Sequence, residues 1–193
     1  MAIREIPVSQ VVVYTLKDWQ AWLKKHHLSE QKVAMISHKK HTGKSSISHK
    51  EAMWEAICWG WIDTTIKRLD DERYIRYFMK RNEQGTGNWS VNTLSYAAQL
   101  EKEGRLQAYG KKMYEHGKQK PAFDAHIPKA PTMPTELRTA LAKHKTAQRN
   151  FDTLTPSAQK TYLRWLLHAK QAETRTKRVA HIVKNVAQNK KLF

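Results

Sequence analysis

The chain has 193 residues, 40% of them hydrophobic, and 35 lysines and arginines against 17 acids give it a net charge of +18. This length allows one domain, or one core with a small appended subdomain, and the composition is that of a globular protein. A single cysteine, Cys58, excludes an internal disulfide and a cysteine-rich metal site. Residues 1–14 contain only a three-residue apolar run, too short for a signal peptide or a membrane span, so we expect a cytoplasmic protein.

The positive charge is concentrated towards the C-terminus. Residues 129–193 contain fourteen lysines and arginines against three acids, a net of +11, and residues 1–128 contain twenty-one against fourteen, a net of +7. Charge of this size attracts polyanions such as nucleic acid, anionic lipid or acidic protein. The alternative is a solvated face that binds nothing, and the sequence leaves both interpretations open.

The first elements alternate between helix and strand. Apolar residues at helical spacing predict an amphipathic helix over residues 18–27, and alternation predicts a strand over residues 32–37. Residues 38–50 contain four lysines, three histidines and no acid, which indicates a solvated loop.

A capped helix and a hairpin follow. Ser48 and Glu51 have the spacing of a capping box, and Gly60 suits the left-handed position that ends a helix, so a helix is expected between them. Residues 61–69 and 73–80 are rich in β-branched and aromatic residues and are separated by an acidic turn. This pattern predicts a β-hairpin.

Beyond Gly87 the pattern is wholly helical. Ser90 can cap a helix that ends at Gly104, a second helix is expected over residues 105–116, and four prolines then mark an extended connector. Three closing helices are predicted over residues 135–144, 156–170 and 173–188.

These elements predict an α+β fold, a small antiparallel sheet with packed helices, followed by a helical C-terminal part. We expect an α+β core domain over residues 1–120, a proline-rich connector over residues 121–134, and a basic three-helix region over residues 135–193 packed on the core.

Several ordered motifs carry a family resemblance. Residues 55–63 have the sequence EAICWGWID, residues 103–106 have EGRL, and residues 169–179 have AKQAETRTKRV. In these motifs the chain resembles the YdeI/OmpD-associated family, also called bacteriocin-protection proteins, with Thr64 and Ala172 where that family has a glycine and a proline. The resemblance covers about residues 19–186 and implies a bacterial protein of stress response or bacteriocin protection. It supplies no catalytic residues.

The segment after the hairpin is the first candidate anion-binding site. Two cations precede a Gly-x-Gly turn that leads into a helix N-terminus, where free N–H groups and the helix dipole favour anions. Its residues are Lys80, Arg81, Gly85, Gly87 and Ser90. The segment lacks the lysine and hydroxyl that end a P-loop, so nucleotide hydrolysis is not indicated. The alternative is a plain connection capped by Ser90.

The last predicted helix is the second candidate. Its cations Lys177, Arg178 and Lys184 lie away from the apolar stripe and could neutralise phosphates. A solvated face is the alternative. For the neighbouring Arg175 we expect a structural ion pair with an acid instead.

Metal, cofactor and catalytic sites are not expected. The histidines at positions 38, 41 and 49 lie among four lysines without a carboxylate, and no catalytic constellation stands out. Cys58 and the tryptophans are expected in the core. We therefore predict a non-enzymatic protein that binds an anionic partner through a basic surface. The alternatives are a sequence-nonspecific nucleic-acid-binding protein and an enzyme acting on a small anionic substrate, and the oligomeric state stays open.

Overall fold

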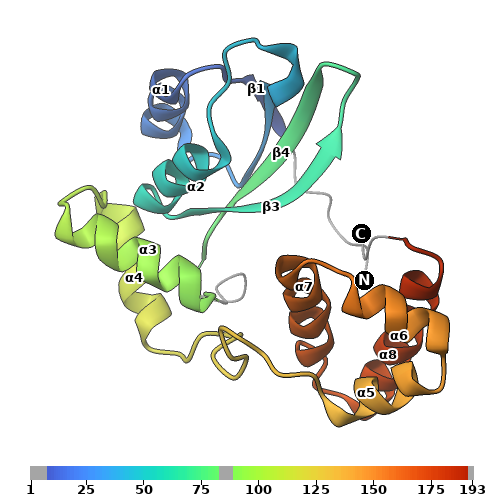
Figure 1. Cartoon of the computed structure of the whole chain (residues 1–193). Helices are drawn as coiled ribbons and strands as arrows, with labels where there is room; N and C mark the ends of the chain where they lie inside the picture. The colour runs from blue at the N-terminus through green and yellow to red at the C-terminus, as the bar shows by residue number, and fades with distance from the viewer. Residues whose placement is uncertain (1–7, 83–88, 191–193) are drawn as a thin grey trace, which may run out of the picture. The chain divides into compact units, whose positions relative to one another are not determined.

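The computed structural model describes residues 8–82 and 89–190. The chain divides into two compact units, residues 1–123 and residues 124–193, which we call the N-terminal unit and the C-terminal unit. The first contains the sheet with its helices and the second is helical (Figure 1). The predicted α+β fold with a helical C-terminal part is therefore confirmed.

The N-terminal unit is built on one four-stranded sheet in the order β1-β2-β4-β3. Its strands are β1 (Ser9–Val12), β2 (Lys32–His38), β3 (Trp61–Arg68) and β4 (Arg73–Lys80). The pairs β2–β4 and β3–β4 are antiparallel, whereas β1 pairs with β2 in parallel, so the sheet is mixed rather than wholly antiparallel. Parallel neighbours need a crossover, which helix α1 (Leu16–His26) supplies between β1 and β2.

The predicted hairpin is confirmed by the pairing of β3 with β4. Its turn is closed by the Asp70 carboxylate, which accepts hydrogen bonds from the backbone N–H groups of Glu72 and Arg73 at 2.9 and 2.6 Å. The register shifts between Asp63 and Ile66, as at a β-bulge.

Helices α1 and α2 (His49–Cys58) cover one face of the sheet. Helix α2 begins at the predicted capping box of Ser48 and Glu51 and ends before Gly60, whose φ is +77°. The core between these helices and the sheet contains the fully buried Trp19 and Trp61, as expected, together with Leu23, Val33, Met35 and Phe78.

A second cluster lies beneath α3 (Val91–Lys102) and α4 (Ala108–Lys118). Its buried members come from α2, α3 and α4 and from Trp89, which precedes the Ser90 N-cap. The backbone N–H of Gln107 donates to the Cys58 carbonyl at 2.9 Å, so the start of α4 is joined to the end of α2.

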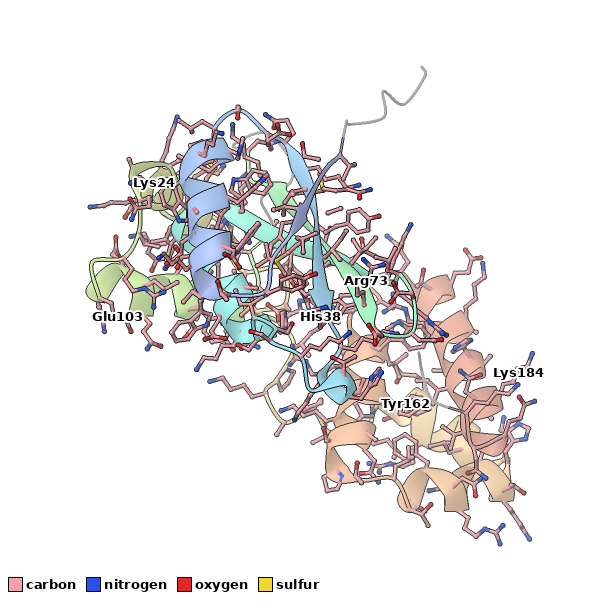
Figure 2. The ribbon with its side chains drawn as sticks, turned by 90° about the horizontal axis from the view of Figure 1, so that it is seen from above. Lys24, His38, Arg73, Glu103, Tyr162 and Lys184 are labelled. Atoms are coloured by element: carbon pink, nitrogen blue, oxygen red, sulfur yellow. The ribbon has the colours of Figure 1, made fainter. Side chains whose placement is uncertain are left out.

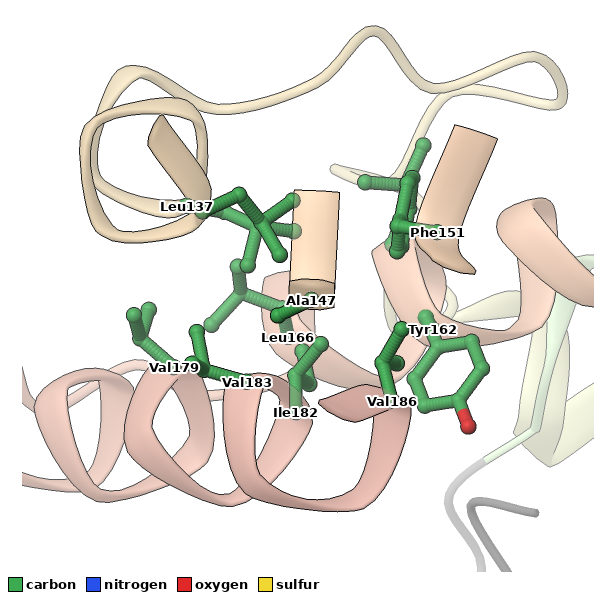
Figure 3. Close-up of a cluster of buried hydrophobic side chains, with 11 residues drawn as sticks. Leu137, Ala147, Phe151, Tyr162, Leu166, Val179, Ile182, Val183 and Val186 are labelled. Atoms are coloured by element: carbon green, nitrogen blue, oxygen red, sulfur yellow. The ribbon is translucent and has the colours of Figure 1, made fainter. Parts of the chain in front are cut away.

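In the C-terminal unit four helices are described where three were predicted. They are α5 (Thr135–Ala142), α6 (Lys145–Asp152), α7 (Pro156–Leu167) and α8 (Ala172–Ala187). Helix α6 was missed because only Ala147 and Phe151 of its eight residues are buried, too few to show a helical period. The shared core includes Leu137, Leu166, Ile182 and Val186 (Figure 3).

Candidate anion-binding sites

Local structure uses two of the candidates from the end of β4. The Lys80 Nζ donates to the Leu28 carbonyl at 2.6 Å and lies 5.1 Å from the centroid of the Tyr109 ring. The Ser90 hydroxyl accepts the backbone N–H of Thr93 at 3.1 Å and caps α3. Gly85 and Gly87 lie outside the described residues.

Arg81, the third described candidate of this segment, is only 1% exposed. Its backbone N–H donates to the Gly60 carbonyl at 2.9 Å, and the Tyr109 hydroxyl donates to its carbonyl at 2.5 Å. Its guanidinium carbon lies 3.8 Å from the centroid of the Trp89 ring. Among the described residues, neither its Nε nor its Nη1 has a hydrogen-bond acceptor.

Burial lowers the pKa of Arg81 from 12.5 to about 10, and the negative charge of Asp63 opposes that shift. At neutral pH the guanidinium therefore remains a cation. The Asp63 carboxylate itself accepts a hydrogen bond from Arg76 at 3.3 Å and lies 3.1 Å from the His49 ring nitrogen Nε2. Among the described residues, the negative charge that acts on Arg81 thus comes from a carboxylate that is already bonded to Arg76.

Sequence reasoning missed the Arg76–Asp63 ion pair, whose side chains are 7% and 23% exposed. A signal was present, because Arg76 and the buried Phe78 are two residues apart and therefore share a face of β4. A cation on that face requires an acid partner on a neighbouring strand.

In the C-terminal unit, two of the three predicted cations have intramolecular partners. The Lys177 Nζ donates to the Glu173 carboxylate at 2.6 Å, with both side chains largely exposed. The Arg178 guanidinium lies over the Trp165 ring and donates to the Trp165 carbonyl. The expected ion pair of Arg175 is present, with Glu136 of α5.

Lys184, the third cation, is exposed and projects from α8 (Figure 2). It lines a groove of about 830 Å³ between α5 and α8 that sequence reasoning did not find. The floor is apolar and includes Ala140, Val179 and Val183, and the other basic side chains that line the groove are Lys143 and His144. The space exists because alanines face it where larger side chains would fill it.

Other reactive groups do not assemble into a site. The described residues contain no cluster of three or more His, Cys, Asp and Glu that could hold a metal ion. Burial, with the nearby Glu55 carboxylate adding to it, raises the pKa of the Cys58 thiol to about 12, which makes it a poor nucleophile. No helix within the described part of the chain has the length and apolarity to cross a membrane.

Two family models match the chain. A model for the domain of unknown function DUF8412 matches residues 11–113, which include strands β2 to β4 and helices α1 to α3. A model described as bacteriocin-protection, YdeI or OmpD-associated matches residues 130–189 in the C-terminal unit. The EAICWGWID and EGRL motifs thus fall in the first match, and the AKQAETRTKRV motif falls in the second.

Neither a curated protein nor a solved structure matches the chain significantly. The first family model covers more than half of the chain, and the second confirms the predicted resemblance over the C-terminal helices. The chain therefore belongs to the DUF8412 family and carries a bacteriocin-protection, YdeI or OmpD-associated segment at residues 130–189.

Proposed function

We propose that the protein is a non-enzymatic binding protein of the bacteriocin-protection or stress type, whose basic C-terminal unit binds an acidic segment of another protein. The match at residues 130–189 supports the general class. The groove between α5 and α8, apolar along its floor and lined by lysines, is the observation that carries the proposal.

The cations of the groove are available for a partner. Lys143 and Lys184 are exposed, and neither has an ion pair within the described part of the chain. Both α5 and α8 begin near the Glu136–Arg175 ion pair, and the two lysines lie roughly two turns further along their helices. At the Glu136–Arg175 end of the groove the charges therefore neutralise each other, whereas at the other end Lys143 and Lys184 present positive charge.

The floor favours a protein partner over a nucleic acid. Val179 and Val183 point from α8 towards α5 (Figure 3), and Ala140 and Ala187 complete an apolar lining. An amphipathic helix can bury its apolar side chains in such a groove and place carboxylates near the lysines. The phosphates of a nucleic acid would gain no binding free energy from contact with an apolar floor.

The test uses fluorescent poly-L-glutamate as the probe, with its anisotropy measured from low to high salt. We expect K143A/K184A to weaken binding and to reduce the salt dependence. The control K160A/K177A removes the same charge from exposed positions outside the groove and should bind like the wild type. Equal losses in both double variants, or binding that does not change with salt, would refute the proposal.

Nonspecific nucleic-acid binding is the second candidate, favoured by the net charge of +11 over residues 129–193. Ala180, an exposed lining residue of the groove, separates the two candidates. A180L fills the groove without changing the charge. It should weaken binding of an acidic amphipathic peptide and leave binding of a single-stranded oligonucleotide intact. If the oligonucleotide binds and the peptide does not, and A180L leaves oligonucleotide binding unchanged, nucleic-acid binding replaces binding of an acidic protein segment as the proposed function.

A further inference from the structure

The N-terminal unit contains a buried cation without a counter-ion among the described residues, and this points to a second site. We infer that the guanidinium of Arg81, held over the Trp89 ring, binds a compact oxyanion group, a phosphate or a carboxylate. The site is separate from the groove of the C-terminal unit and does not depend on the function proposed for that groove.

The other buried charged side chains each have a charged or polar partner. For Arg76 this partner is Asp63, although the Arg76 Nε also meets no acceptor among the described residues. The Glu55 carboxylate accepts hydrogen bonds from Gln20, Trp59 and Arg105, at 3.1, 2.9 and 3.5 Å. Asp124 accepts one from Arg164 at 3.2 Å. Each of these carboxylates has at least one hydrogen-bonded partner, as buried charges require.

Arg81 departs from that rule. A guanidinium carries five N–H donors, and the Nε and Nη1 of Arg81 account for three of them. None of these three meets an acceptor in residues 8–82 or 89–190. Asp63, whose charge acts on Arg81, is already bonded to Arg76. Within these residues, the positive charge is thus buried without a partner that compensates it.

Two alternatives to an external anion are insufficient. Deprotonation would remove the charge, but Arg81 keeps a pKa of about 10 and stays cationic at neutral pH. The Trp89 ring attracts the guanidinium through its π-face, yet it accepts none of the in-plane N–H bonds. An oxyanion supplies both the negative charge and the acceptor atoms.

The Arg81 backbone and the Trp89 side chain are held in place before any anion binds. The Arg81 backbone is hydrogen-bonded at both its N–H and its carbonyl. The Trp89 carbonyl accepts the backbone N–H of Phe123 at 3.0 Å, and its indole packs on α4 so closely that a Cβ at Gly117 would lie 2.4 Å from Trp89 Nε1. Such preorganisation lowers the entropic cost of binding. The start of α3, two residues beyond Trp89, adds a favourable dipole.

The first experiment measures thermal unfolding of the full chain in chloride, phosphate and acetate at one ionic strength. We expect phosphate or acetate to raise the melting temperature by about 3–5 °C at ten times the dissociation constant. In R81M the increase should disappear, while the melting temperature in chloride should change little, because removing a buried charge without an ion-pair partner offsets the loss of the cation–π contact with Trp89. Whichever of the two anions raises the melting temperature of the wild type more is the preferred ligand.

A matched control comes from Arg178, which also lies over a tryptophan but donates to a carbonyl. R178M should lower the melting temperature in every buffer and keep the anion-dependent increase. If R81M behaves in this way instead, Arg81 has a purely structural role and the inference is wrong.

A second readout does not depend on stability. In a ¹⁵N-labelled sample, the Nε–Hε signal of Arg81 is the one missing from R81K, which keeps the charge and should keep the fold. Titration with inorganic phosphate or acetate should shift this signal and leave the other arginine Nε–Hε signals nearly unchanged. An Arg81 signal that does not move with either anion would overturn the inference.

Discussion

The Arg178 guanidinium lies over the indole ring of Trp165, with its central carbon 4.7 Å from the ring centroid, and donates a hydrogen bond to the Trp165 carbonyl. Trp165 is in the last turn of α7, so a cation on the first turns of α8 holds the two helices together. The sequence makes the same arginine a candidate for binding a partner. Its contacts instead favour a role in packing.

We therefore expect R178A to lower the free energy of unfolding by about 1–2 kcal/mol, because a cation–π contact and a hydrogen bond to a half-buried carbonyl are lost. Urea unfolding measures this change. R178K keeps the charge but not the planar contact, and it should recover only part of the loss. The salt dependence of poly-L-glutamate binding should be the same in R178A as in the wild type. If R178A instead reduced this salt dependence and left stability unchanged, Arg178 would be a binding residue and the packing role would be wrong.

Gly110 offers a test of how closely α4 approaches α2. A Cβ at this position would lie 2.1 Å from the Cys58 carbonyl oxygen, so G110A forces the two helices apart. We expect a loss of about 2–3 kcal/mol, although alanine is the better helix former. Gly104 is the control, because its φ is +66° but no atom lies within 4 Å of a Cβ there. G104A should cost only about 1 kcal/mol, and equal costs for the two variants would contradict the close packing.

The elements that the sequence predicted are those specified by neighbouring residues. The capping box of Ser48 and Glu51, the acidic turn of the hairpin and the glycine after α2 each act over a few positions, and all three are present. Strand β1 was missed because its valines acquire a strand partner only across α1, in the parallel pairing of Val11 with Met35. No local pattern reports a partner at that distance.

The candidate sites were harder to predict because each depends on what a side chain meets in the fold. Lys177, Arg178 and Lys184 look equivalent in the sequence, yet one pairs with Glu173, one packs on Trp165 and one lines the groove. The groove itself depends on which residues of α5 face α8. These contacts depend on the tertiary structure, so the helical spacing of the cations cannot predict them.

The ion pair between Glu136 and Arg175 makes the C-terminal unit sensitive to acid. Hydrogen bonding from Arg175 lowers the pKa of Glu136 below its usual 4.5. The stabilisation is therefore present above the unfolded pKa and is lost as pH falls through the lower, folded pKa. Because both side chains are about one-third exposed or more, we expect less than about 1 kcal/mol. The difference in unfolding free energy between wild type and E136Q should be largest above the usual pKa of 4.5 and should disappear as the pH falls through the lower, folded pKa. A difference that persists in acid would exclude this pair as its source.

Cys58 provides a probe of the N-terminal unit, since it is the only cysteine and is 1% exposed. Its pKa of about 12 lies above the usual 9.0 of a free thiol, so at pH 8 the folded protein contains roughly a thousandfold less thiolate than the unfolded chain. We expect a chromogenic disulfide reagent to react with the native protein only at the rate at which the unit opens. Urea should accelerate the reaction in parallel with unfolding, and G110A, which separates α4 from the end of α2, should accelerate it without urea. The matched control G104A should react nearly as slowly as the wild type. Fast labelling of the native wild type at pH 8 would show that the thiol is accessible and that the packing of α2 against α4 is looser than the structure indicates.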